Sequence, residues 1–284
     1  MTATADLPQT EARSVHANGI DIHYLEAGEG EPLVLLHGGI VSTNPIWTGV
    51  PIAYASHMAT LSTHFRVIAP DTRGAGRTVH TGGTVGFDLL ADDVAALVDA
   101  LGLERPLVAG FSEGGITATI VGIRHPGSVR AIVNHAGYDA FAPAVQPTLA
   151  AMMRQMLGGS PDATEAAPDA AARFFSQSAE MQGAFELLKA DEDGGQGKDH
   201  WKEYLRLAFH RLTNPTGYTT QDLSAITAPT LIIVGDRDHF CSVEEAVCAY
   251  RALAEGELAI VPATGHIITH PLVELMVEFL ERWS

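Results

Sequence analysis

A serine lies within a glycine-rich hexapeptide that follows the pattern Gly-x-Ser-x-Gly. Residues 110–115 read Gly-Phe-Ser-Glu-Gly-Gly, between an apolar run expected to form a strand and a helical pattern over 114–124. A sharp strand-to-helix turn would project the serine above the sheet edge, and the helix N-terminus would offer free N–H groups to a developing oxyanion. The motif therefore predicts that Ser112 is a nucleophile. The alternative is a chance match in which Ser112 only caps a helix.

A serine hydroxyl is a weak nucleophile and needs a base that is itself held by a third group. Two polar residues supply these roles in the chain order Ser, acid, His. Asp238 comes shortly after the apolar run 230–235, and His266 follows the last predicted strand. Carboxylates and imidazoles at the carboxyl ends of parallel strands lie at the edge where ligands bind. We therefore predict a catalytic set of Ser112, Asp238 and His266, with Asp139 as the alternative acid.

A second glycine-rich turn follows an early apolar run. His37, Gly38 and Gly39 come directly after residues 33–36. This position predicts a loop that faces the Gly-x-Ser-x-Gly turn, so that the N–H of Gly39 (or of Ile40) and the N–H of Glu113 form an oxyanion hole. The alternative is an ordinary glycine turn after a strand.

The elements needed to position these residues alternate along the chain. Residues 19–36 indicate a β-hairpin, and later apolar runs alternate with helical patterns, which predicts a mostly parallel sheet covered on both faces. From about residue 138 to 221 no buried-strand pattern occurs. We expect this stretch to be a helical cap with helical segments over 147–157, 166–189 and 200–212 and a loose acidic, glycine-rich joint over 191–197. The predicted organisation is therefore a core (1–137), a cap insertion (138–221) and the rest of the core (222–284).

Composition narrows the classes of partner. The chain has 284 residues, of which 46% are hydrophobic, and a formal net charge of −17. Such a charge repels phosphate backbones, so we expect neither nucleic acid nor membrane as a partner. We find no run long enough to span a membrane and no signal-peptide pattern. Cys241 and Cys248 are too far apart for a disulfide if they share a helix, and we expect a reduced, cytoplasmic protein.

A metal site is not expected. His266 and His270 have the i,i+4 spacing of some metal ligands, but Pro271 indicates that a helix begins there, so the two imidazoles would not share a helical face. No third ligand stands nearby, and no cofactor is expected. The sequence gives no indication of the oligomeric state.

Taken together, these motifs resemble the α/β-hydrolase superfamily over residues 14–284. The resemblance includes a further segment, Asp71-Thr72-Arg73-Gly74-Ala75-Gly76, which is structural in that superfamily, so we expect a buried supporting role for Asp71 and Arg73. It implies an α/β fold: a mostly parallel eight-stranded sheet with helices on both faces and a helical cap. The implied activity is that of a carboxylic-ester-type hydrolase, an esterase or lactonase that acts on a small molecule without a cofactor.

The resemblance also separates branches of the superfamily. Haloalkane dehalogenases and epoxide hydrolases use an aspartate nucleophile, whereas this chain has Ser112. Residues 110–118 locally resemble the valacyclovir-hydrolase-like branch, in which an acid near the serine helps to recognise an amino group. Glu113 is the corresponding candidate here. The alternative is that Glu113 only occupies the first helical turn, where the helix dipole favours an acid.

Specificity would depend on side chains under the cap. The candidate substrate-binding residues are Ile40, Trp47, Tyr138, Phe141 and Trp201, although aromatic residues in such a segment more often form its core. Two other functions use the same constellation. One is C–C bond hydrolysis of a β-diketone-like substrate, and the other is a small-molecule receptor with very slow turnover.

Overall fold

The computed structural model describes residues 9–44, 48–80, 82–137, 154, 155, 157, 163–214 and 216–284. Within these residues, eight strands form one sheet with the order β1-β2-β4-β3-β5-β6-β7-β8. The strands are β1 (Glu11–Ala17), β2 (Ile20–Ala27), β3 (Pro32–Leu36), β4 (Arg66–Pro70), β5 (Leu107–Phe111), β6 (Ile132–His135), β7 (Thr230–Gly235) and β8 (Gly256–Val261). The pairings from β4 to β8 are parallel, while β2 pairs antiparallel with both β1 and β4.

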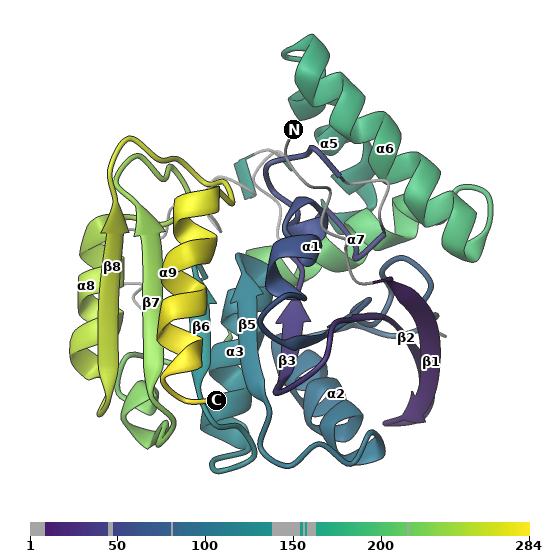
Figure 1. The fold of residues 1–284 in the computed structure, drawn as a ribbon. Helices are drawn as coiled ribbons and strands as arrows, with labels where there is room; N and C mark the ends of the chain where they lie inside the picture. The colour runs from purple at the N-terminus through teal and green to yellow at the C-terminus, as the bar shows by residue number, and fades with distance from the viewer. Residues whose placement is uncertain are drawn as a thin grey trace, which may run out of the picture.

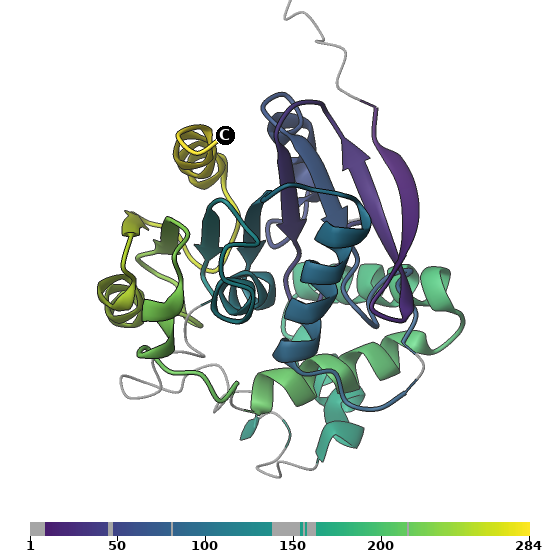
Figure 2. The same cartoon turned by 90° about the horizontal axis from the view of Figure 1, so that it is seen from below.

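Helices pack on both faces of this sheet and at the carboxyl ends of its central strands (Figure 1). They are α1 (Met58–Leu61), α2 (Phe87–Ala100), α3 (Glu113–Arg124), α5 (Ala167–Phe175), α6 (Ala179–Gln196), α7 (His200–Thr213), α8 (Val243–Ala252) and α9 (His270–Glu281), with short 3₁₀ turns η2 (Tyr54–Ser56), η3 (Ala163–Ala166) and η4 (Asp222–Ala225). Helix α9 lies on one face, and α2, α3 and α8 lie on the other (Figures 1 and 2). The central strands are therefore buried on both faces, which explains why β5, β6 and β7 are continuous apolar runs. The predicted fold class is confirmed.

The hairpin predicted over residues 19–36 is wrong. Strand β2 does not pair with β3, because β4 is inserted between them. The hairpin partner of β2 is β1, in the register Ala17↔Ile20. The turn between them contains Asn18 and Gly19, both with positive φ, as tight hairpin turns require. Strand β1 was missed because most of its side chains are exposed and give little apolar alternation.

Helices α5, α6 and α7 lie between β6 and β7 in the sequence and sit at the carboxyl ends of the central strands (Figure 1). They have an apolar core of their own, which also includes residues of the loop after β3. The predicted helix over 166–189 is two helices, because Ser178 accepts a hydrogen bond from the N–H of Met181 and starts a new one. The predicted segment 147–157 falls mostly outside the described residues.

The joint expected over 191–197 is not loose. Helix α6 continues through Gln196, and Asp191 and Glu192 are buried. Gly195 is needed because a Cβ there would overlap the carbonyl of Gly76. The glycines thus allow close packing of a helix against a loop, which sequence composition alone does not distinguish from flexibility. None of the described helices combines the length and apolar character needed to cross a membrane.

The segment from Asp71 to Gly76 supports the loops around the sheet edge. Asp71 is fully buried and accepts hydrogen bonds from the N–H and hydroxyl of Thr43 and from the N–H of Arg77. Arg73 pairs with the buried Asp93 through two hydrogen bonds. Both side chains therefore have the supporting role expected from the sequence, and neither lines the cavity beside the serine.

Candidate active site

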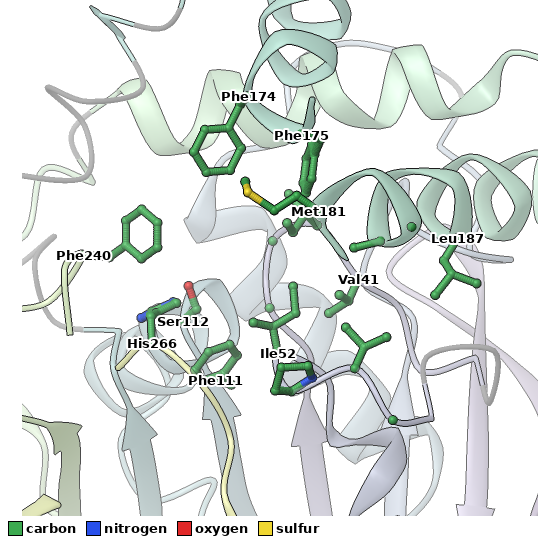
Figure 3. Close-up of a pocket in the computed structure, with 18 of the residues that line it drawn as sticks. Val41, Ile52, Phe111, Ser112, Phe174, Phe175, Met181, Leu187, Phe240 and His266 are labelled. Atoms are coloured by element: carbon green, nitrogen blue, oxygen red, sulfur yellow. The ribbon is translucent and has the colours of Figure 1, made fainter. Parts of the chain in front are cut away.

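Ser112 occupies the turn between β5 and α3. Its φ of 53° and ψ of −116° are unusual for a residue with a side chain. Backbone strain of this kind occurs where surrounding structure holds a functional residue in place. Here a Cβ on Gly110 would overlap the carbonyl of Gly114, so glycine permits the close strand–helix approach that creates the turn. The turn brings the Ser112 side chain to the wall of a cavity (Figure 3).

His266 and Asp238 form a partly buried hydrogen-bonded pair beside this serine. The distance from His266 Nδ1 to Asp238 Oδ2 is 2.8 Å. The other oxygen, Asp238 Oδ1, accepts the N–H groups of Phe240 and Cys241 at 2.8 and 3.0 Å. Because an ionised carboxylate only accepts, Nδ1 of His266 carries the proton and Nε2 is left as the basic nitrogen.

Two phenylalanine rings hold the His266 imidazole. The ring of Phe111 lies 4.7 Å from the imidazole centroid, and that of Phe240 lies 4.8 Å away in a T-shaped arrangement. The ring of Phe111 also lies 4.7 Å from that of His135, whose pKa burial lowers to about 3, so that His135 stays neutral near neutral pH. Figure 3 shows Ser112 and His266 side by side, with Phe240 next to them.

The loop after β3 is held so that its N–H groups have fixed directions. Nε2 of His37 accepts the N–H of Thr72 at 3.0 Å, so its Nδ1 carries the proton and donates to the Gly38 carbonyl at 2.7 Å. The peptide group that contains the Gly38 carbonyl also contains the Gly39 N–H, which therefore points the opposite way. Gly39 and Ile40 both line the cavity, as an oxyanion-hole loop would.

The side chain of Glu113 is not in the cavity. It is 2% exposed, and its Oε1 accepts a hydrogen bond from Arg211 Nη2 at 2.6 Å. The structure therefore does not place this carboxylate where it could bind a substrate ammonium group. Its backbone N–H is the first of helix α3, and such N–H groups lack an intrahelical partner.

The cavity has a volume of about 450 Å³, within the range of small-molecule sites. Ser112 and His266 contribute its polar side chains, and the rest of its described lining is apolar side chain or glycine. The larger lining side chains are those of Ile40, Val41, Val50, Ile52, Phe111, Phe174, Phe175, Met181, Leu187, Leu212 and Phe240. Every lysine and arginine of the chain lies within the described residues, and none lines the cavity.

The other predicted binding residues are distributed differently. Trp201 does not line the cavity; its ring packs edge-on against Phe185 in the core of the α5–α7 helices. Trp47, Tyr138 and Phe141 lie outside the described residues, as does the alternative acid Asp139.

Several residues at the site were missed from the sequence. Met181 and Leu187 were not singled out as binding residues, yet both line the cavity. Tyr204 and Arg211 of α7 contact the loop after β3 and the first residue of α3, which carry the candidate oxyanion donors, and neither residue was given this role from the sequence. Their seven-residue spacing, which places them on one face of a helix, was the available signal.

Asp238, Cys241 and His266 each bring one potential metal-ligand atom within 4.8 Å of the others. These side chains are already engaged with the protein: Cys241 Sγ donates to the carbonyl of Ala136 at 3.0 Å, and Asp238 binds His266 as described above. His270 lies at the start of α9 and pairs with Glu274, separate from His266.

The strand order, the strained serine between a strand and a helix, and the paired imidazole and carboxylate define an α/β-hydrolase type of architecture. A family model described as alpha/beta hydrolase fold matches residues 31–270. The chain belongs to this family.

Relatives in the family differ in their reactions. The chain is 36% identical over 122 residues to the 2-hydroxy-6-oxo-2,4-heptadienoate hydrolase of Pseudomonas putida, an alignment that covers 43% of this chain and only 42% of that protein. It is 28% identical over 252 residues to the AB hydrolase superfamily protein YisY of Bacillus subtilis, covering 85% of this chain and 87% of that protein. Among solved structures, the enol-lactonase from Burkholderia xenovorans LB400 superimposes with a TM-score of 0.68 at 22% identity, covering 95% of this chain and 99% of that chain, which shows a shared fold.

Proposed function

We propose that this protein is a serine hydrolase that cleaves an ester or lactone bond of a small, neutral and largely apolar substrate. The observation that carries the proposal is the placement of Ser112 and His266 on one apolar cavity, with His266 Nδ1 bonded to Asp238.

The proposed mechanism follows from this geometry. Ser112 Oγ attacks the substrate carbonyl while His266 Nε2 takes its proton, and Asp238 stabilises the imidazolium that forms. The N–H groups of Gly39 and Glu113 bind the resulting oxyanion. His266 then gives the proton to the leaving alcohol, and an acyl-enzyme remains. Water, activated by the same imidazole, hydrolyses that ester.

The cavity wall supports a neutral substrate. A substrate carboxylate buried there would need a cationic partner, because an unpaired charge in an apolar site is costly. No arginine or lysine of the chain lines the cavity, and the buried guanidinium of Arg211 is paired with Glu113, the residue after the serine. An uncharged acyl group can fill the apolar wall without such a cost.

The test is hydrolysis of p-nitrophenyl esters of increasing acyl length by the wild type and by Ser112→Ala. We expect saturable turnover in the wild type and a loss in kcat of more than about 10⁴-fold in the variant. Stoichiometric modification of Ser112 by diisopropyl fluorophosphate, read by mass spectrometry, gives a second readout. Retained turnover in folded Ser112→Ala would overturn the nucleophile assignment.

Hydrolysis of a C–C bond next to a ketone is a second candidate, favoured by the local similarity to the dienoate hydrolase. That relative's substrate, by its name, carries a carboxylate, for which the described cavity wall offers no cation. An enzyme that is modified by diisopropyl fluorophosphate and cleaves diketones but no ester would establish this candidate instead.

A further inference from the structure

Helix α7 contacts both chain segments that carry the candidate oxyanion donors. Tyr204 and Arg211 project from the same face of this helix, since seven residues are close to two full turns. Both side chains are fully buried. One contacts the loop after β3, and the other contacts the first residue of α3.

Tyr204 fixes the loop through its hydroxyl. The hydroxyl donates to the carbonyl of Gly39 at 2.9 Å and also lies 3.3 Å from the carbonyl of Val41. Burial raises the pKa of Tyr204, as do the Glu113 and Glu192 carboxylates, so its proton stays available. Because a peptide group is planar, holding the Gly39 carbonyl also sets the plane that contains the Ile40 N–H. The peptide groups on both sides of Gly39 are therefore held, one by Tyr204 and one by His37.

Arg211 fixes the other segment through Glu113. Arg211 Nη2 binds Glu113 Oε1, while Glu113 Oε2 lies against Gly39. The Glu113 carboxylate thus fills the space between α3 and the loop. A bare carboxylate at this place would repel a developing oxyanion, and the guanidinium of Arg211 neutralises it.

We propose that Tyr204 and Arg211 are positioning residues for the oxyanion hole, so that the hole is held in its working geometry only while α7 is docked. This inference rests on the proposed function for its catalytic part. Its structural part, that α7 orders the loop, can be tested without turnover.

The first test compares Tyr204→Phe with Tyr54→Phe, which also removes a buried tyrosine hydroxyl. The Tyr54 hydroxyl donates a weak hydrogen bond to Met276 Sδ at 3.9 Å. We expect hydrogen–deuterium exchange of residues 38–42 to be about 3–10-fold faster in Tyr204→Phe and unchanged in Tyr54→Phe. Exchange at the wild-type rate in Tyr204→Phe would overturn the inference, whether or not the protein hydrolyses esters.

The second readout is kinetic. We expect Tyr204→Phe to lower kcat about 10-fold or more while KM stays within about twofold of the wild type. Inhibition by an alkyl trifluoromethyl ketone should become weaker by a similar factor, because only the tetrahedral adduct that it forms uses the oxyanion hole. Faster exchange without any loss of kcat in an active enzyme would contradict the catalytic part. Faster exchange in a protein that neither cleaves esters nor reacts with diisopropyl fluorophosphate would overturn the proposed function but support the ordering of the loop by α7.

Arg211 is tested by charge removal. Arg211→Met leaves the Glu113 carboxylate uncompensated, whereas Arg211→Met with Glu113→Gln removes that charge as well. We expect the double variant to have a kcat about 10-fold or more above the single variant. Equal kcat values in the folded single and double variants would show that Arg211 acts only by packing. If Arg211→Met does not fold, the exchange and kcat of Tyr204→Phe test whether α7 positions the hole.

Discussion

The carboxylate of Glu113 lies directly against the backbone of Gly39: a Cβ built on Gly39 would be 2.9 Å from Glu113 Oε2. The side chain of Glu113, in the first turn of α3, therefore packs against the backbone of Gly39 in the loop after β3. A side chain at position 39 would therefore displace the Glu113 carboxylate or the loop. This contact also gives Glu113 a structural role in place of recognition of a substrate amine.

Gly39→Ala should separate these two segments. We expect kcat to fall about 10²-fold while the protein remains folded, because a displaced donor no longer meets the oxyanion. Gly86→Ala is the control, since no atom lies within 4 Å of a Cβ at that position. Ester hydrolysis with thermal unfolding of both variants checks the prediction, and wild-type kcat in Gly39→Ala would argue against Gly39 as part of the hole.

How much of the site could be predicted depended on how local its signals were. Ser112, Asp238 and His266 each follow a strand at the same sheet edge, so their chain order and neighbouring glycines were enough to propose them together. The hydrogen bond between His266 and Asp238 is consistent with that proposal. The fold was readable for a similar reason, because strands buried on both faces give long apolar runs.

The missed features depend on contacts between distant residues. The ion pair between Glu113 and Arg211 joins positions 98 residues apart, and periodicity within one helix does not reveal such a partner. Strand β1 was missed because an exposed edge strand carries a weak pattern. The buried acids Asp191 and Glu192 look like a solvated run in the sequence. In the structure Asp191 accepts hydrogen bonds from Ser42 and Asn44, and Glu192 accepts the N–H of Gly76, so α6 packs against both loops.

The identity of the orienting acid can be decided by two matched variants. We expect Asp238→Asn to lower kcat about 10⁴-fold, because an amide at this place no longer favours the required His266 tautomer. Asp139→Asn, the same change at the alternative acid, should keep kcat within about threefold of the wild type. The opposite pattern of ester hydrolysis rates would transfer the role to Asp139.

The far end of the cavity should limit acyl length. Leu187 lines the cavity on the side away from His266 and Phe240 (Figure 3). We expect Leu187→Trp to reduce kcat/KM about 10-fold or more for the longest p-nitrophenyl esters that the wild type accepts and to leave acetate within about twofold, because the indole fills apolar space without touching the serine. Leu187→Ala is the matched control and should not lower kcat/KM for the longest esters. A uniform loss for all chain lengths would show that this end of the cavity does not hold the acyl group.

Glu192 should make the stability of the protein depend on pH. Burial, with the neighbouring carboxylates of Asp191, Asp71 and Asp193, raises the pKa of Glu192 to about 9. The folded protein therefore keeps this proton where the unfolded chain has lost it, between its ordinary value of 4.5 and about 9. In that window the unfolded state binds fewer protons, so the free energy of unfolding falls as the pH rises.

Glu192→Gln should remove most of this dependence, because an amide resembles the neutral acid and its oxygen can still accept the N–H of Gly76. The difference in free energy of unfolding, variant minus wild type, should be about 1–3 kcal/mol larger at pH 8 than at pH 5. Glu186→Gln, an exposed change on the same helix, is the control and should follow the wild type. Urea denaturation of the three proteins from pH 5 to 9 gives the result. If the Glu192→Gln curve runs parallel to that of the wild type, Glu192 is ionised in the folded protein and α6 tolerates the charge.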